Sequence, residues 1–389
     1  MTEHTIPLVV HLIYRLDFGG LETLLVDCIN HMPEHKYRHA IVCLTNHTAF
    51  SEKITRQDVQ IVDLNKAPGL GLGTHVALWK LLRQLRPAIL HTYNLSAIEY
   101  TFTASLAGVP VRIHAEHGRD ISDPLGRNRK HNLLRRLMTP FIDTYVAVSN
   151  DLHGWLKTSI HVPDTKNRLI NNGVDTRRFS PEADSAVTTP WPAECFVIGT
   201  VGRLQDIKNQ QGLIRAFVLL REALPAHQDK LRLSIIGDGP LLATLKQQVA
   251  AAGISDVVWL PGARSDIAAI MRGFNLFALP SLAEGTPVTL LEAMSSGLPV
   301  VVSRVGGIPE VVQEGVHGAL VAAADDAAFA QAFAEYCQRP AMLRQHGAAA
   351  SQYVRQKFSI TAMVNSYTNL YDALCKNKFK ESSKPCVES

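Results

Sequence analysis

The chain of 389 residues is longer than one hydrophobic core usually supports, so we expect two domains. A hydrophobic content of 46% and a charged content of 19% are typical of a packed enzyme, and a net charge of only +4 argues against a nucleic-acid-binding protein. The six cysteines form no Cys-x-x-Cys pair, which argues against a zinc site or a disulfide framework, and no apolar run is long enough to span a membrane. We therefore expect a cytoplasmic protein.

The N-terminal half alternates short apolar segments with helical patterns. Strands are expected at 8–13, 39–44, 59–64, 89–92 and 111–116, and helices from about 21, at 74–85 and at 96–106. This alternation predicts a doubly wound parallel sheet. Gly19 and Gly20 follow the first strand, where backbone can approach a ligand closely, although a plain tight turn has the same sequence. The Gly-x-Gly-x-x-Gly fingerprint is absent here, which disfavours an oxidoreductase.

His117 comes directly after the expected strand 111–116. A polar side chain at this position would lie at the carboxyl end of the sheet, where ligands bind in such folds. His114 and His91 are nearby alternatives, and a lone histidine can equally be structural.

Two acidic residues, Glu116 and Asp120, lie close to this histidine in the sequence. They could orient hydroxyl groups of an acceptor. Salt bridges to Arg112 or Arg119 are an equally good interpretation.

Residues 127–138 combine five Arg or Lys residues with four apolar side chains on one stripe, namely Leu133, Leu134, Leu137 and Met138. A basic amphipathic helix of this kind can lie on anionic lipid. The alternative is a solvated helix whose leucines pack on the sheet, and both can hold if the basic face points outward. Peripheral contact with an anionic membrane, at the inner face of the plasma membrane, is therefore an expectation for 127–138.

The C-terminal half repeats the alternation. A strand at 196–202 is followed by Arg203 and Lys208, in the loop before a helix at 210–222. Both cations are thus expected at the carboxyl end of a strand, where they could bind an anion. An ion pair of either cation with Asp206 is the alternative. Pro, Ala, Ser and Thr dominate segment 181–194, where we expect a linker, and segment 376–389 lacks an apolar period, so we expect a disordered tail there.

A second anion site is expected after the apolar run 276–279. Thr286 stands where an N-cap would be and Pro287 at the first helical position, so a helix should span 287–296. The free amides of Val288 and Thr289 at its N-terminus would attract an anion.

Two carboxylates flank that helix end. Glu284 precedes the helix, and Glu292 is expected with Val288 and Ser295 on the side opposite the packed Leu290, Leu291 and Met294. The alternative interpretation is a pair of surface glutamates on an ordinary helix.

The spacing Glu284-x7-Glu292 resembles the acid signature of the family-4 type of retaining glycosyltransferases, which have the GT-B fold: two α/β, Rossmann-like, doubly wound domains facing across a cleft. Further segments look like motifs of that family, namely Arg203 with Lys208, the turn 237–240, and 172–175 with 178–181. Segments 18–22, 116–120 and 172–176 look especially like exopolysaccharide sugar transferases from exosortase (PEP-CTERM-associated) loci. The resemblance covers about residues 8–375.

The resemblance implies roles for individual residues. Catalytic roles fall on Glu284 and His117, which would position the donor sugar, and on Arg203 and Lys208, which would bind its diphosphate. Donor binding is implied for Gly19, Gly20, Arg203, Lys208, Glu284, Thr286, Val288, Thr289, Glu292, Gly306 and Gly307, with Glu292 on the ribose. Pro287 stands where many members have glycine, which removes one amide donor.

The resemblance also implies a domain organisation and a reaction. Residues 1–182 would form the acceptor-side domain, 183–360 the nucleotide-sugar domain, 361–375 a helix that returns to the first domain, and 376–389 the tail. A sugar would move from a nucleoside diphosphate sugar to a glycan or lipid-linked acceptor in exopolysaccharide biosynthesis, with retained configuration and with no metal or cofactor. A sugar-nucleotide epimerase on the same fold and a non-catalytic sugar-nucleotide-binding partner are the alternatives.

Overall fold

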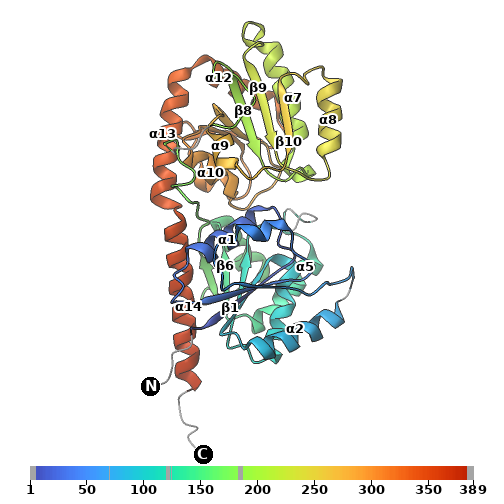
Figure 1. Ribbon diagram of the computed structural model, residues 1–389, viewed down its shortest axis with the longest axis vertical. Helices are drawn as coiled ribbons and strands as arrows, with labels where there is room; N and C mark the ends of the chain where they lie inside the picture. The colour runs from blue at the N-terminus through green and yellow to red at the C-terminus, as the bar shows by residue number, and fades with distance from the viewer. Residues whose placement is uncertain (1–5, 70, 120–122, 124, 183–186, 383–389) are drawn as a thin grey trace, which may run out of the picture. The chain divides into compact units, whose positions relative to one another are not determined.

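The computed structural model describes residues 6–69, 71–119, 123, 125–182 and 187–382. The chain divides into two units, the first comprising Met1–Asn171 with Ile360–Ser389 and the second comprising Asn172–Ser359. Each unit is a parallel β-sheet with helices on both faces (Figure 1). The expected pair of doubly wound α/β domains is confirmed.

The sheet of the first unit has seven parallel strands in the order β3-β2-β1-β4-β5-β6-β7. The side chains of the inner strands are buried almost throughout because helices cover both faces, which explains the unbroken apolar runs in the sequence, whereas the edge strands β3 and β7 are partly exposed. The strands are β1 (Leu8–Ile13), β2 (Arg38–Cys43), β3 (Gln60–Asp63), β4 (Ile89–Tyr93), β5 (Val111–Glu116), β6 (Thr144–Ala147) and β7 (Asn167–Leu169).

Two helix layers cover this sheet. The helical segments are α1 (Gly20–His31), η1 (Ala49–Lys53), α2 (Leu72–Leu85), α3 (Asn94–Ile98), α4 (Tyr100–Leu106), α5 (Arg129–Met138), η2 (Thr139–Phe141), α6 (Asn150–Trp155), η3 (Leu156–Ile160) and α14 (Ile360–Ser382). The crossovers through α2, α4 and α5 all advance in one direction along the sheet, so right-handed connections place these helices on one face. The opposite layer contains α1 and α14, which pack together (Figure 1).

The second unit has a six-stranded parallel sheet in the order β10-β9-β8-β11-β12-β13. Its strands are β8 (Phe196–Val201), β9 (Leu231–Ile236), β10 (Val258–Gly262), β11 (Leu276–Leu279), β12 (Val300–Ser303) and β13 (Gly318–Val321). Its helical segments are η4 (Asp206–Lys208), α7 (Gln210–Ala223), η5 (Pro225–His227), α8 (Leu242–Ala251), α9 (Ile267–Met271), α10 (Val288–Ser295), α11 (Ile308–Val311), α12 (Asp326–Gln338) and α13 (Pro340–Lys357). One apolar cluster lies on each face of the sheet.

The boundary between the units lies earlier in the chain than the expected position at 182. Residues 172–182 belong to the second unit because the amide of Val174 donates to the carbonyl of Phe358 (2.9 Å) and Phe179 is buried in the apolar core of that unit. The hydroxyl of Ser295 also donates to the carbonyl of Phe179 (2.5 Å). An apolar anchor, rather than the composition of the following linker, thus determines which unit this segment joins.

The C-terminal end also differs from the expectation of a disordered tail at 376–389. The helix α14 continues to Ser382, and the ammonium of Lys378 pairs with the carboxylate of Asp143 (3.0 Å). The first proline after 376 is Pro385, so the sequence contains no residue that would end the helix earlier. Residues 383–389 lie outside the described residues. None of the helices in the described part of the chain has both the length and the apolar character needed to cross a membrane.

Candidate active site

The predicted donor-site residues of the second unit lie in three neighbouring loops. The strand β8 lies between β9 and β11, so the order of the strands reverses direction at β8, and the carboxyl end of β8 is the switch point of the sheet. The loop after β8 carries Arg203 and Lys208, the segment after β11 carries Glu284 to Glu292, and the loop after β12 carries Gly306 and Gly307. The fold therefore brings these three sets of residues to the position where doubly wound sheets bind ligands.

Lys208 and Glu284 form an ion pair. The ammonium of Lys208 lies 2.6 Å from Oε1 of Glu284, and the hydroxyl of Ser281 donates to the same oxygen (2.6 Å). The side chains of the lysine and the glutamate are 23% and 9% exposed. The alternative partner, Asp206, is not the residue that Lys208 contacts. An ammonium group carries more than one N–H donor, so Lys208 can contact an anion without leaving Glu284.

Arg203 is exposed in the loop that follows β8. Its carbonyl accepts a hydrogen bond from the side-chain amide of Gln210 (3.0 Å), which ties the loop to the start of α7. Gly237 has φ +145°, and a Cβ atom there would overlap with the carbonyl oxygen of Gly202. The glycine after β9 therefore lets one loop lie directly against the backbone that precedes Arg203.

The helix α10 begins one residue later than expected. Pro287 is the N-cap, with φ −67° and ψ 124°, and its side chain offers no acceptor for the first-turn amides. Thr286 is therefore not the N-cap; its carbonyl accepts a hydrogen bond from the side chain of Asn172 (2.8 Å). The hydroxyl of Thr289 donates to the carbonyl of Val201 (3.1 Å) and so ties α10 to the end of β8. The amides of Val288 and Thr289 begin the helix, where an anion is favoured.

The expected open side of α10 is narrower than predicted. Val288 and Ser295 are buried, and only Thr289 and Glu292 are partly exposed within the helix. The reason is that α13 packs against α10, and the hydroxyl of Ser351 donates to the carbonyl of Ser295 (3.0 Å). Glu292 thus lies on a narrow strip between two packed faces.

Gly306 supports the position of Glu284. Its φ of +51° and the overlap that a Cβ atom would make with the carbonyl oxygen of Glu284 both require a glycine. The amide of Gly307 donates to the carbonyl of Gly285 (3.1 Å), whereas its own φ of −81° is ordinary. Gly306 and Gly307 therefore lie directly against the loop of Glu284. Their contact with the donor stays a prediction.

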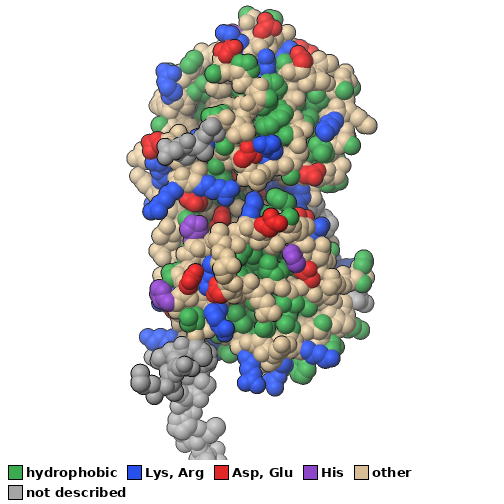
Figure 2. All heavy atoms as spheres, in the orientation of Figure 1, with side chains coloured by type: hydrophobic (Ala, Val, Ile, Leu, Met, Phe, Trp, Pro, Cys, Tyr) green, Lys and Arg blue, Asp and Glu red, His purple; other side chains and the backbone are tan. Residues whose placement is uncertain are grey.

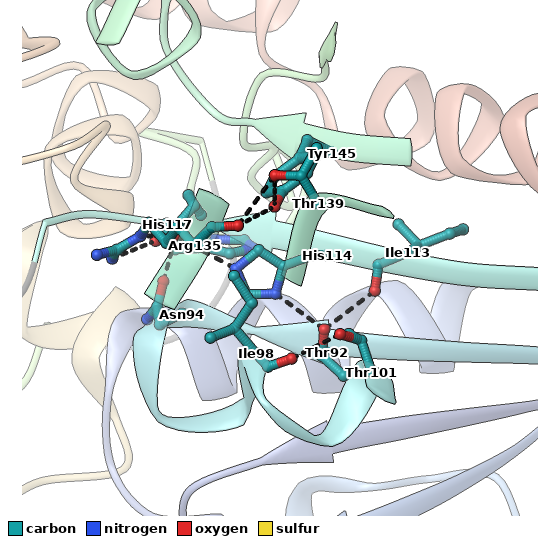
Figure 3. Close-up of polar contacts among 11 residues, drawn as sticks. Thr92, Asn94, Ile98, Thr101, Ile113, His114, His117, Arg135, Thr139 and Tyr145 are labelled. Carbon is teal, nitrogen blue, oxygen red and sulfur yellow. Dashed lines mark hydrogen bonds and ion pairs between the residues drawn. The ribbon is translucent and has the colours of Figure 1, made fainter. Parts of the chain in front are cut away.

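His117 lies at the end of β5 in the first unit. Its amide donates to the side-chain oxygen of Asn94 (2.8 Å), as Figure 3 shows. Both ring nitrogens are buried, without a hydrogen-bond partner among the described residues, and burial lowers the pKa of the ring to about 4. The ring is therefore neutral at pH 7. It lines a cavity of about 10 Å³ together with Leu21, Leu24, Leu25, Cys28, Tyr93, Met363, Tyr367 and Tyr371.

The alternative histidines have partners. Nδ1 of His114 lies 2.8 Å from the hydroxyl of Thr92 (Figure 3), and its Nε2 lies 3.2 Å from Oε1 of Glu116. Nδ1 of His91 lies 2.9 Å from the hydroxyl of Tyr371. Both side chains are fully buried, although Nε2 of His91, like the ring nitrogens of His117, has no partner among the described residues.

Glu116 has a partner that the sequence did not suggest. Nε of Arg135, on α5, donates to its Oε1 (2.6 Å), and both side chains are buried. Burial alone would raise the pKa of Glu116, but the charge of Arg135 and the hydrogen bond from His114 lower it to about 2. The expected role with acceptor hydroxyls is therefore wrong for Glu116, and so is the pairing with Arg112 or Arg119. Asp120 lies outside the described residues.

Gly19 and Gly20 lie at the start of α1. Gly19 is the N-cap, with φ −171° and ψ 163°, and no side chain caps the helix. This is extended backbone that any residue can adopt, so the backbone shape at Gly19 does not require a glycine. A role of the two glycines in donor binding stays a prediction.

The basic segment 127–138 folds largely as α5. Of the four apolar side chains on its stripe, two pack on the core and two are exposed. Leu134 and Met138 pack on the core, whereas Leu133 and Leu137 are exposed. Arg135, one of its five cations, is buried and paired with Glu116. The alternative in which the leucines pack on the sheet therefore holds for only part of the stripe.

Two Rossmann-like units, each with its own parallel sheet, are the architecture of the GT-B fold. Solved structures of GT-B enzymes have the same fold as this chain. The structure of Anabaena Alr3699/HepE in complex with UDP and glucose aligns with a TM-score of 0.79, at 19% identity, over 94% of this chain and 99% of that chain.

Residues 18–178 match the family model described as Glycosyltransferase Family 4, and residues 195–339 match the one described as Glycosyl transferases group 1. The lipopolysaccharide core biosynthesis mannosyltransferase LpcC of Rhizobium leguminosarum bv. viciae is 31% identical over 63% of this chain and 69% of its own length. The UDP-Gal:alpha-D-GlcNAc-diphosphoundecaprenol alpha-1,3-galactosyltransferase of Escherichia coli is 27% identical over 78% and 80%. The chain belongs to the family-4 glycosyltransferases and is an enzyme of that type.

Proposed function

We propose that this glycosyltransferase moves a sugar from a nucleoside diphosphate sugar to a glycan or lipid-linked acceptor in exopolysaccharide biosynthesis, with retained configuration and without a metal ion. The observation that carries the proposal is the Lys208–Glu284 pair beside the N-terminus of α10, at the switch point of the second sheet. Two relatives support the donor class, since the Escherichia coli enzyme is named for UDP-Gal and the Anabaena protein binds UDP and glucose.

The departing diphosphate is the part of the donor that gains negative charge as the glycosidic bond breaks. Arg203, Lys208 and the amides of Val288 and Thr289 would stabilise that charge. Fixed cations and helix amides do this without reorganising at the moment of reaction. The proposal of a metal-independent reaction rests on these groups, and Pro287 contributes no amide to them.

The hydroxyl groups of the donor sugar and of the ribose need hydrogen-bond partners. Glu284, held by Lys208 and Ser281, would accept hydrogen bonds from the donor sugar, and Glu292 would bind the ribose. His117 would hydrogen-bond the donor sugar as a neutral ring, which supplies one donor and one acceptor. The transition state would resemble an oxocarbenium ion, with no carboxylate nucleophile of the kind that common retaining glycosidases use.

Peripheral contact with an anionic membrane through residues 127–138 is part of the proposal. The exposed Leu133 and Leu137 lie on the same helix as the exposed Arg129, Lys130 and Arg136. Exposed leucines beside cations fit the surface of an anionic bilayer. A relative whose name specifies a diphosphoundecaprenol-linked acceptor is consistent with an enzyme that works at a membrane.

The test is turnover with a panel of nucleotide sugars and membrane lipid extract, followed by mass spectrometry and by proton NMR of the new anomeric centre. We expect transfer that persists in EDTA and an anomeric configuration equal to that of the donor. Loss of activity in EDTA would contradict metal independence, and an inverted product would contradict retention. Conversion of the donor without any acceptor would indicate an epimerase, and binding without turnover would indicate a non-catalytic partner.

A further inference from the structure

A second concave surface lies in the first unit, at the end of the sheet opposite His117. A cavity of about 790 Å³ is bordered by residues that precede or begin strands, including Leu8, Ala88 and Pro110, whereas His117 follows a strand. Because all strands of this sheet are parallel, the two places lie at opposite edges. The cavity is therefore separate from the proposed donor site.

The cavity is apolar on one part of its wall and cationic on another. Ile6, Pro7, Leu82 and Val109 are among its apolar residues, and its cations are Arg38, Arg83 and Arg86. The guanidinium groups of Arg83 and Arg86 form no hydrogen bond or ion pair with any described residue, while Nε of Arg38 donates to the carbonyl of Ile6 (3.3 Å).

The acidic residue of the lining does not balance these charges. The carboxylate of Asp372 is paired with the ammonium of Lys36 (3.2 Å) and accepts a hydrogen bond from the hydroxyl of Tyr37 (2.6 Å). Guanidinium groups without carboxylate partners bind phosphate well, because their planar N–H groups match its oxygens. The chemistry of the cavity therefore fits a phosphate group attached to an apolar body.

An exposed apolar ridge leads to this cavity. On α2, Leu72, Val76 and Trp79 are exposed at a spacing of one helical face, with exposed fractions of 79%, 55% and 40%, and Arg83 continues that face into the cavity. On α4, which packs beside α2, Phe102 and Leu106 are exposed at positions i and i+4, just before the cavity residue Ala107. The ridge thus consists of Leu72, Val76, Trp79, Phe102 and Leu106.

Ridge and cations together have the composition of a bilayer-binding surface. Tryptophan and leucine side chains are favoured at the boundary between headgroups and acyl chains, and Arg or Lys side chains beside them are attracted to anionic lipid. Figure 2 shows green hydrophobic and blue basic side chains close together over the part of the first unit where Figure 1 labels α2. The positive charge of the three arginines therefore favours an anionic partner. The exposed apolar side chains of the ridge favour a partner with an apolar interior, such as a bilayer.

We propose that the ridge and the cavity form a docking surface for an anionic phospholipid bilayer. Arg38, Arg83 and Arg86 bind the headgroup phosphate, and the ridge inserts among the outer ends of the acyl chains. This surface is distinct from α5, to which the proposed function assigns a membrane contact, and it goes beyond that function by adding a second contact in the same unit. The full-length protein can be tested directly.

The first experiment is co-sedimentation with phosphatidylcholine vesicles, with and without phosphatidylglycerol. We expect binding to the vesicles that contain phosphatidylglycerol, and a decrease of roughly tenfold or more in the Arg83→Gln/Arg86→Gln variant, since each cation near an anionic surface contributes on the order of a fivefold factor. The matched control is Lys246→Gln/Arg344→Gln, which removes two exposed cations from the second unit and should leave binding nearly unchanged. Absence of binding to anionic vesicles, or equal binding by both double variants, overturns the proposal.

The second experiment uses Trp79 as its own reporter. Vesicles that contain phosphatidylglycerol should shift the tryptophan emission to the blue in the native protein and not in Trp79→Phe, which keeps an apolar ring and should fold normally. An unchanged shift in Trp79→Phe contradicts insertion of the ridge.

Two further experiments test the alternatives to this proposal, namely membrane binding through α5 alone and binding of free phosphate in the cavity. If Arg129→Gln/Lys130→Gln on α5 abolishes vesicle binding while Arg83→Gln/Arg86→Gln does not, α5 alone is the membrane surface and the proposal fails. If inorganic phosphate binds in an Arg83-dependent manner and vesicles do not bind, the cavity is a site for free phosphate and the proposal also fails.

Discussion

The predicted site residues of the two units differ in how their polar groups are satisfied. In the second unit, Lys208, Glu284 and Ser281 bind one another at the edge of solvent. In the first unit, the residues behind the site, Glu116 and its partner Arg135, are fully paired, whereas the ring of His117 has no partner among the described residues. A buried polar group without a partner is costly, and this supports the prediction that His117 contacts the donor sugar. The second unit thus contains a closed ion pair, whereas the first unit presents an imidazole whose two ring nitrogens have no partner among the described residues.

The largest expected effect comes from breaking the buried pair behind His117. Arg135→Met should lower the free energy of unfolding by about 3–5 kcal/mol, because it leaves the carboxylate of Glu116 buried without its counter-charge. Chemical denaturation measures this. Arg136→Met, on the exposed side of the same helix, is the control. If the two variants were equally stable, the pair would not be the structural support described here.

Removing the ammonium group of Lys208 tests the proposed diphosphate site of the second unit. Lys208→Ala should lower kcat by roughly 10²–10³-fold, because the charge that develops on the diphosphate loses its stabilisation and Glu284 loses its partner. Steady-state kinetics with a soluble acceptor would show the loss, and Lys246→Ala should not change kcat. An unchanged kcat in Lys208→Ala would remove the main support for the diphosphate role.

The unsatisfied histidine should make the protein sensitive to acid. The pKa of His117 is lowered from 6.5 to about 4, so the unfolded chain takes up a proton that the folded chain does not, and stability falls as the pH drops from 6.5 towards 4. Other buried histidines, such as His39 with a pKa lowered to about 3, act in the same direction. Below pH 4.5, Glu116 adds a further loss as its carboxylate is protonated in the unfolded chain, down to its folded pKa of about 2.

Thermal unfolding as a function of pH measures this dependence, and His117→Asn should reduce its slope between pH 6.5 and 4. Asparagine keeps a polar side chain without a titrating group. A slope that is identical in both proteins would show that ligand-free His117 has access to water.

The smallest expected effect comes from the hydroxyl that orients Glu284. Ser281→Ala removes one hydrogen bond to a charged oxygen and should raise KM for the donor by roughly tenfold, because Lys208 still holds Glu284 and the loss lies at the low end of such bonds, about 1.5 kcal/mol. Ser366→Ala, whose hydroxyl bonds only within its own helix, is the control for kinetics. A decrease in kcat without a change in KM would instead place Ser281 in the chemical step.

Much of the fold was accessible from the sequence because parallel strands buried on both faces leave long apolar runs. The strands β1 and β5 have the bounds that the pattern predicted, and the segment after β11 lies where its acid spacing suggested. The pairing of Lys208 with Glu284 was not accessible, because it joins two loops 76 residues apart in the chain. The first residue of α10 was predicted one position too early, because Pro287 can stand at the N-cap as well as at the first helical position.

The position of Arg135 in the sequence does indicate that its side chain is buried. It lies three residues before Met138, so the two side chains lie on one face of α5. A cation on an apolar stripe must find a buried acid or disrupt the helix, and Glu116 at the end of an apolar strand was the available acid. Reading the stripe for its exceptions would have linked the two elements.

The balanced charge of Lys208 has a consequence for selectivity. Since Glu284 already neutralises the ammonium group, orthophosphate or pyrophosphate finds only weak attraction there and must also repel the carboxylate. A compound that offers a phosphate oxygen to the lysine and a hydroxyl hydrogen to the glutamate satisfies both partners at once. If the proposed function holds, the pair would therefore discriminate against inorganic anions and favour molecules that carry a sugar next to a phosphate.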